Sequence, residues 1–291
     1  MKKIDFEALE GAQLYGFIFT KNKEKNAEKN KEIILSVHGM ASSCLKKRDE
    51  EIAKKANEHN IDYFCFNNRG SDLVKYIKIN SSKHICGSTF ENPLDGYLDI
   101  LGAINKLKQL GYTKIHLLGH SLGCTKIVYT YKKLLEENSE IINNIASISL
   151  LSLIDIPMAI KAYLNERYSE ILTYALESNS EVILPQNSFI HPISAGTFLC
   201  YTVNNKEINF AQYGRDDKME VLNNIKCPLF MRWGDVKEMI IGEAEELSFN
   251  MNNIIKNHNK NISYIHGANH SYDGMENVVA NELIKFILNN N

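Results

Sequence analysis

A serine between two glycines is the first feature of this sequence that could do chemistry. The pentapeptide at residues 119–123 reads Gly-His-Ser-Leu-Gly, after the apolar run 114–118 and before residues that favour a helix. A serine hydroxyl becomes a useful nucleophile when a sharp strand-to-helix turn holds it beside a base. A side chain at either flanking glycine would collide with the neighbouring strand or helix. Ser121 is therefore a candidate nucleophile for acyl transfer.

A base for this serine is available late in the chain. The apolar run 262–265 is followed by a loop of small residues with His270 at its tip, and then by a helical pattern. A histidine on a loop beyond the last strand stands where it could reach Ser121. His266 is the alternative, but it lies at the strand end, where side chains tend to be packed. We therefore expect His270 to be the base.

The acid that orients the base has two candidates. Asp235 directly follows Gly234 at the end of the apolar run 229–233, and Glu238 stands three residues further on. Either carboxylate could hold His270 in the required tautomer and stabilise its charged form. The other would cap the following helix or be solvated.

Donors for a developing oxyanion are expected in two places. The apolar run 33–37 ends in His38-Gly39, and the loop after it can present the backbone N–H of Met40. The N–H of Leu122, at the start of the helix after the serine, would be the second donor. His38 itself is interpreted as a hydrogen-bonded structural residue.

The elements that position these residues alternate between apolar runs and helical patterns. Most runs from Glu32 onward are almost continuously hydrophobic, which is typical of parallel strands buried on both faces. The expected strands cover residues 13–20, 32–37, 61–66, 114–118, 145–151, 229–233 and 262–265. The expected helices cover residues 45–58, 94–110, 122–137, 243–257 and 275–288. This alternation predicts an α/β fold with a mostly parallel central sheet flanked by helices.

Two segments interrupt the alternation. Residues 21–31 are almost wholly Lys, Asn and Glu, and their glutamates and lack of aromatics favour a solvated hairpin loop over a nucleic-acid contact. Residues 155–226 begin with a helical pattern at 158–176 and continue irregularly. An insert of that size between two strands is too long for a simple crossover, so it predicts a cap over the carboxyl edge of the sheet. Its Tyr, Phe, Leu and Ile content suggests a partly apolar pocket, although any one of these side chains could equally pack the cap onto the sheet.

Composition excludes several classes of protein. The chain is 44% hydrophobic and 23% charged, as in ordinary soluble domains, and its net charge of −2 gives no reason to expect nucleic acid as a partner. The six cysteines are scattered without a Cys-x-x-Cys motif, which favours reduced thiols over disulfides or a zinc site. No stretch approaches the length of a membrane span, and early acidic residues interrupt any signal peptide. We expect a cytoplasmic protein.

Taken together, these motifs resemble the α/β-hydrolase superfamily over essentially the whole chain. They are His38-Gly39, Asn68-Arg69-Gly70, the serine pentapeptide, Trp233-Gly234-Asp235 and Gly267-Ala268-Asn269-His270. Residues 99–131 and 192–196 also resemble a little-characterised group related to fungal siderophore-type esterases. The resemblance implies an α/β-hydrolase fold in one domain over residues 1–291, with the cap at about 155–226.

One departure from the superfamily pattern concerns the acid. Relatives usually carry it as Gly-x-x-Asp, and the corresponding position here is Lys237. The role must pass to Glu238 or Asp235, or be lost. Similarity that continues past Lys237 favours Glu238, whose longer side chain could offset a shift of one residue.

The resemblance and the motifs predict a serine hydrolase that cleaves a carboxylic ester or related acyl bond through an acyl-enzyme. The substrate would be a small acyl compound, and no metal or organic cofactor is implied. The missing Gly-x-x-Asp acid leaves a non-catalytic binding or receptor protein on the same fold as an alternative. An acyltransferase, which shares the acyl-enzyme, is another.

Overall fold

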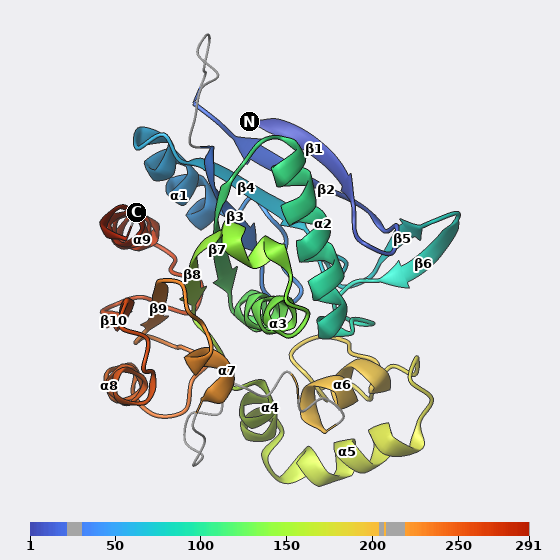
Figure 1. The fold of residues 1–291 in the computed structure, drawn as a ribbon. Helices are drawn as coiled ribbons and strands as arrows, with labels where there is room; N and C mark the ends of the chain where they lie inside the picture. The colour runs from blue at the N-terminus through green and yellow to red at the C-terminus, as the bar shows by residue number, and fades with distance from the viewer. Residues whose placement is uncertain (22–30, 204–206, 208–218, 291) are drawn as a thin grey trace.

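A twisted central sheet organises the molecule (Figure 1). The computed structural model describes residues 1–21, 31–203, 207 and 219–290. In that part of the chain, the sheet has eight strands, ordered β1 (Lys2–Glu7), β2 (Gln13–Phe19), β4 (Asp62–Asn67), β3 (Glu32–Val37), β7 (Lys114–His120), β8 (Ile145–Leu151), β9 (Leu229–Gly234) and β10 (Lys260–Ile265). From β4 to β10 neighbouring strands run parallel, whereas β1 and β2 form an antiparallel edge.

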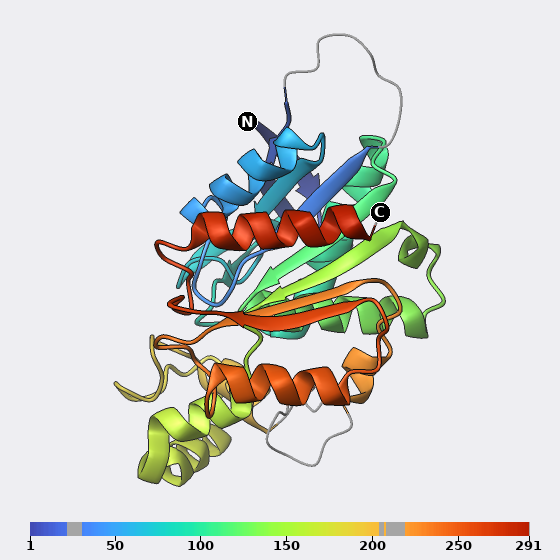
Figure 2. The same ribbon diagram turned by 90° about the vertical axis from the view of Figure 1, so that its left-hand side faces the viewer.

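Helices cover both faces of this sheet. They are α1 (Lys47–Glu58), α2 (Gly96–Gln109), α3 (Leu122–Glu136), α8 (Ala244–Ile254) and α9 (Glu276–Asn289). Successive residues of β3 point to opposite faces, so Ile33 and Leu35 pack in the apolar core with α2, α3 and α8, while Ile34 packs with α1 and α9. Figure 2 shows α1 and α9 side by side on one face. The predicted mostly parallel α/β sheet flanked by helices is confirmed.

Along the chain, a further group of helices follows β8 and precedes β9. It comprises α4 (Ile156–Leu164), α5 (Tyr168–Glu177), α6 (Ala195–Thr202) and the short α7 (Glu220–Asn223). In Figure 1, α4, α5 and α6 lie together beyond one end of the sheet. They share an apolar cluster with Leu122, the first residue of α3. We call residues 156–202 the cap helices; the predicted cap boundaries and the division of the chain into one domain stay predictions.

Some local expectations were wrong. The helix expected at 158–176 is interrupted by a 3-10 turn, η3 (Asn165–Arg167), because Asn165 adopts a left-handed φ of 50°. Strand β1 and the hairpin β5 (Lys75–Ile79) and β6 (Ser82–Cys86) were not expected, nor were α6 and the 3-10 turns η1 (Pro93–Asp95) and η2 (Glu140–Asn144). Residues 22–30 lie outside the described part, but β4 separates β2 from β3, so these two strands form no hairpin.

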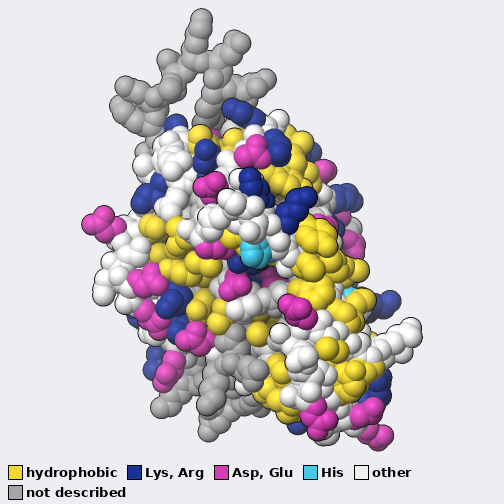
Figure 3. Space-filling view, turned by 90° about the vertical axis from the view of Figure 1, so that its right-hand side faces the viewer, with side chains coloured by type: hydrophobic (Ala, Val, Ile, Leu, Met, Phe, Trp, Pro, Cys, Tyr) yellow, Lys and Arg dark blue, Asp and Glu magenta, His cyan; other side chains and the backbone are white. Residues whose placement is uncertain are grey.

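No single type of side chain dominates the face of the molecule in Figure 3. On the face seen in Figure 3, basic and acidic groups are intermixed with hydrophobic patches. The β5–β6 hairpin contributes exposed Tyr76 and Ile85, which are cross-strand partners. The six cysteines are free thiols, and Cys44, Cys65 and Cys124 are buried. No helix in the described ranges is both long and apolar enough to cross a membrane.

Candidate active site

Ser121 occupies the sharp turn between β7 and α3. Its backbone has a φ of 54° and a ψ of −125°, a conformation that residues with side chains rarely adopt. Its N–H donates to the carbonyl oxygen of Leu151, at the end of β8, at 2.9 Å. Because α3 begins at the next residue, the chain reverses within one residue and the serine stands at the carboxyl edge of the sheet.

The glycines that flank the serine are required by their neighbours. A Cβ on Gly123 would lie 2.1 Å from the carbonyl oxygen of Val37, at the end of β3. A Cβ on Gly119 would lie 2.6 Å from Cα of Cys124, in the first turn of α3. Both contacts are with backbone, which cannot rotate away. The expected collisions with strand and helix are therefore confirmed.

His270 lies in the loop after β10 and contacts Glu238, in the loop after β9. Its Nδ1 forms a hydrogen bond with Oε1 of Glu238. Since an ionised carboxylate only accepts hydrogen bonds, Nδ1 carries a proton, and Nε2 is the ring nitrogen left available to accept one in the neutral tautomer. His270 and Ser121 line the same cavity, of about 250 Å³. The structure thus brings this imidazole to the pocket of the predicted nucleophile.

The carboxylate of Glu238 is buried and held at both oxygens. Oε2 accepts from the N–H of Gly234 at 2.9 Å and from Oγ of Ser152 at 2.7 Å, and Oε1 accepts from the N–H of Met239 at 2.9 Å. A left-handed φ of 50° at Lys237 turns the chain back toward Gly234. Burial raises the pKa of Glu238, but the hydrogen bond and charge of His270 and the Gly234 amide outweigh it and hold the pKa below its ordinary value.

Asp235 contacts a different histidine. Its carboxylate accepts from Nδ1 of His266 and from the N–H of Gly267, both at 2.7 Å. The side chain of His266 is 93% exposed, and neither member of this pair lines the cavity. The two candidate acids therefore face two different histidines, and Glu238 is the one beside His270.

His120, inside the serine pentapeptide, fixes the loop that carries His270. Its Nε2 donates to the backbone carbonyl oxygen of His270 at 2.7 Å. Burial, and after it the charge of Arg48, holds the pKa of His120 well below its ordinary value, so the ring is neutral. The two imidazole rings have centroids 5.0 Å apart. His120 is thus a packing and hydrogen-bonding residue in this arrangement.

The loop after β3 lies directly beside the serine. Gly39 and Met40 line the cavity, and a Cβ on Gly39 would lie 3.0 Å from Cβ of Ser121. Nδ1 of His38 donates to the carbonyl oxygen of Gly39 at 2.8 Å, and its Nε2 accepts from the N–H of Asn68 at 3.2 Å. Burial, with a smaller contribution from the charge of Lys126, lowers the pKa of His38 to about 3. His38 is the structural residue that the sequence predicted.

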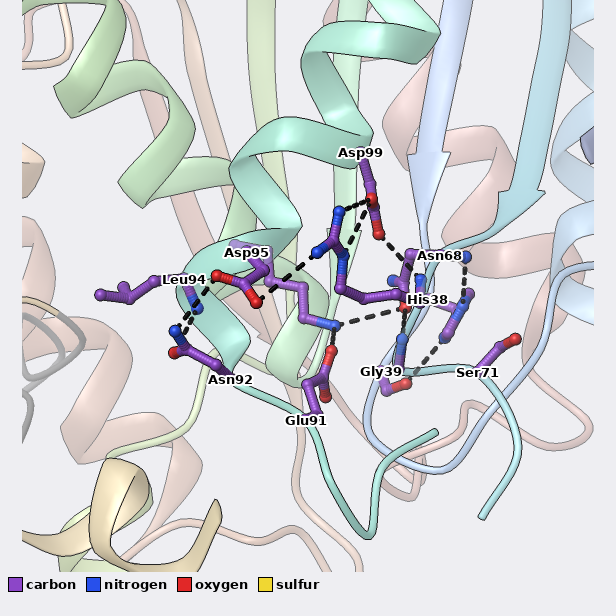
Figure 4. A network of polar contacts seen from close by, with 12 residues as sticks. His38, Gly39, Asn68, Ser71, Glu91, Asn92, Leu94, Asp95 and Asp99 are labelled. Carbon is purple, nitrogen blue, oxygen red and sulfur yellow. Dashed lines mark hydrogen bonds and ion pairs between the residues drawn. The ribbon is translucent and has the colours of Figure 1, made fainter. Parts of the chain in front are cut away.

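A buried polar network that the residue patterns did not predict continues from this loop. Figure 4 shows His38, Asn68 and Glu91 in one connected set. Nζ of Lys126, on α3, pairs with Glu91 and lies 3.4 Å from Oδ1 of Asn68. The hydroxyl of Tyr201, on α6, lies 3.4 Å from the other oxygen of Glu91. A lone lysine within the apolar stretch of α3 was the signal that could have indicated a buried partner.

The cap helices, together with Ile154 just before them, give the cavity an apolar wall. The aliphatic and aromatic side chains that line it are Ile154, Ile156, Ile160, Tyr163, Phe189 and Ile190. Leu122, the second predicted oxyanion donor, is buried in the same apolar cluster. The cavity can therefore exclude water around an apolar group that lies next to Ser121.

Comparisons with known proteins agree with this architecture. No protein-family model matches the chain, and no curated protein matches it in sequence. Among solved structures, the chain is similar to Est1E from Butyrivibrio proteoclasticus, with 15% identity, a TM-score of 0.67, and coverage of 100% of this chain and 99% of that one. It is also similar to a soluble variant of monoglyceride lipase from Saccharomyces cerevisiae, with 14% identity, a TM-score of 0.65, and coverage of 98% and 94%. A third is the α/β hydrolase GrgF from Penicillium sp. sh18, with 14% identity, a TM-score of 0.65, and coverage of 98% and 97%.

These likenesses define the class of fold. The chain has the α/β-hydrolase fold, as the resemblance of its motifs implied. At these identities the likeness concerns the fold, and the chemistry has to be argued from the residues of the site.

Proposed function

We propose that the protein is a serine hydrolase that cleaves a carboxylic ester or a related acyl bond. One observation carries this proposal. Ser121, in a strained turn, and His270, held by a buried carboxylate, line one cavity with an apolar wall. A nucleophile, a base and an acid that orients the base are the parts that acyl transfer by serine requires.

In the proposed reaction, Oγ of Ser121 attacks the acyl carbon while Nε2 of His270 takes its proton. Glu238 stabilises the imidazolium that forms. The N–H groups of Met40 and Leu122 hold the oxyanion. His270 then gives the proton to the departing alcohol, which leaves an acyl-enzyme on Ser121. Water, deprotonated by His270, attacks the acyl-enzyme and releases the carboxylic acid and the free serine.

The similar structures support an ester as substrate. Est1E has a structure with ferulic acid bound, and the yeast protein is a monoglyceride lipase. We transfer to this chain only the common element of those names, a small acyl compound as the substrate class.

Two alternative functions, a binding protein and an acyltransferase, rest on different observations. A binding protein on this fold was suggested by the missing Gly-x-x-Asp acid, whereas the contact between Glu238 and His270 supports a catalytic site. An acyltransferase would use the same acyl-enzyme and is distinguished by its products. Adding an alcohol or amine acceptor to the assay and measuring the transferred acyl group separates transfer from hydrolysis.

Turnover of p-nitrophenyl butanoate tests the proposal. We expect the wild type to release p-nitrophenol and Ser121→Ala to reduce the rate by about 10³-fold or more. Release at an unchanged rate in Ser121→Ala would show that this serine is not the nucleophile.

A further inference from the structure

A second hollow adjoins the cavity at Ser121. It has a volume of about 270 Å³. Three residues line both spaces: Ser42, His120 and Ser271. The second hollow therefore begins where the apolar cavity ends, and a substrate that spans Ser121 could extend into it.

The lining of this hollow is basic where the first cavity is apolar. Lys46, Lys47 and Arg48, at the start of α1, contribute three cations to its wall. Asp273 and Glu276 contribute two carboxylates, which leaves a net formal charge of three minus two, or +1.

Of the two acidic groups in the lining, Glu276 pairs with a cation and Asp273 accepts from a neutral amide. Lys47 pairs with Glu276 at 3.1 Å. Oδ2 of Asp273 accepts from the side-chain amide of Asn269 at 3.0 Å. The cations that remain are Lys46, which is exposed, and Arg48.

Arg48 is the most informative of these groups because it is only 7% exposed. Its Nη1 donates to the backbone carbonyl oxygen of Ser271 at 3.4 Å, and no carboxylate among the described residues forms an ion pair with it. Burying a guanidinium without an opposite charge is costly. A planar guanidinium also matches a carboxylate through two parallel hydrogen bonds. An anionic group of the substrate would supply the missing charge.

We propose that this hollow is a subsite for a carboxylate of the substrate. The substrate class is then an ester with an apolar group on one side of the scissile bond, in the cavity under the cap helices, and a carboxylate on the other. This inference rests on the proposed hydrolase function, because it places the two ends of the substrate on either side of Ser121.

Two matched pairs of esters test the subsite. In the first pair, O-butanoyl glycolate is compared with its neutral analogue O-butanoyl glycolamide by release of butanoate. In the second pair, monobutyl succinate is compared with monobutyl succinamate by release of butanol. We expect kcat/KM to be about tenfold higher for the carboxylate in at least one pair, and the pair that shows it identifies the side of the bond that faces Arg48.

Substitutions test which side chains cause the preference for the carboxylate over the amide. Arg48→Gln and Lys46→Gln are each expected to lower the ratio of kcat/KM for carboxylate over amide by about tenfold. Lys54→Gln, on the exposed side of the same helix, should leave the ratio unchanged. If Arg48→Gln fails to fold, Lys46→Gln still gives the answer, because Lys46 is exposed.

The outcomes separate this inference from the proposed function. Equal kcat/KM for carboxylate and amide in both pairs, with hydrolysis abolished in Ser121→Ala, would overturn the subsite alone. So would a preference that neither variant reduces. Hydrolysis that survives in Ser121→Ala would instead overturn the proposed function.

Discussion

Nδ1 of His270 and Oε1 of Glu238 form a hydrogen bond that joins the loops after the last two strands of the sheet. The same carboxylate also accepts from Gly234, in β9, and from Ser152, just after β8. The orientation of the imidazole is therefore fixed by a side chain that is itself fixed at both oxygens. In the proposed reaction, an imidazole held in this way would take the proton of Ser121 without first rearranging, which would lower the barrier.

Glu238→Gln should lower kcat for ester hydrolysis by between about 10²- and 10⁴-fold, because a neutral amide cannot stabilise the imidazolium. Asp235→Asn is the matched control, since Asp235 contacts His266 outside the cavity. We expect Asp235→Asn to change kcat by about twofold at most. Steady-state kinetics on a p-nitrophenyl ester gives both values. A larger loss in Asp235→Asn than in Glu238→Gln would reverse the assignment of the acid.

The buried His38 should make the stability of the fold depend on pH. Its pKa is about 3 in the folded protein and 6.5 when unperturbed. Between these values the unfolded chain binds a proton that the folded chain does not, so the free energy of unfolding falls as the pH falls from 6.5 toward 3. The contribution from this residue is about 1.4 kcal/mol per pH unit within that window.

Urea unfolding at pH 7 and pH 5 measures this dependence. For each protein, the loss is the decrease in its free energy of unfolding between pH 7 and pH 5. We expect this loss to be about 2 kcal/mol larger in the wild type than in His38→Asn. An equal loss in both proteins would show that His38 does not stay neutral when folded.

Removing Lys126 should strongly destabilise the fold. Its partner Glu91 is fully buried, and Lys126→Met would leave that carboxylate without an opposite charge. We expect a loss of about 3–5 kcal/mol in the free energy of unfolding. The double variant with Glu91→Met replaces both charges by apolar groups, so it should be more stable than the single variant. Additive losses in the double variant would contradict a direct interaction between the two side chains.

Gly123→Ala should damage the site through the backbone. The new Cβ would meet the carbonyl oxygen of Val37 at 2.1 Å, so α3 would have to move away from β3 and carry Ser121 with it. We expect activity to fall about 10²-fold, since a displacement of about 1 Å at the reacting atoms has an effect of that size. Lys54→Ala, at an exposed position of α1, is the control, because it keeps the helical Cβ and removes only an exposed side chain. Equal activities in the two variants would refute the steric role of Gly123.

Residue patterns predicted the parallel sheet because its central strands are buried on both faces and read as continuous apolar runs. Strand β1 was missed because its buried residues, Ile4 and Phe6, alternate with exposed charged residues, so the segment has no continuous apolar run. The break at Asn165 depends on one backbone angle, which a helical pattern of side chains does not reveal.

In the candidate site, Ser121 and His270 follow apolar runs and could be selected from the sequence alone. The choice between Asp235 and Glu238 depends on the path of the loop, which turns at Lys237, and no local pattern specifies that turn. Arg48 and Lys126 were missed for a related reason. Their surroundings come from distant parts of the chain that meet only in the folded protein.

Covalent labelling by a fluorophosphonate tests most directly whether Ser121 is an activated nucleophile. We expect intact-protein mass spectrometry to show a single adduct on the folded wild type, mapped by peptide analysis to Ser121. The adduct should be absent from Ser121→Ala and form more slowly in Glu238→Gln. A folded wild type that stays unlabelled, or an adduct that persists in Ser121→Ala, would contradict the proposed chemistry.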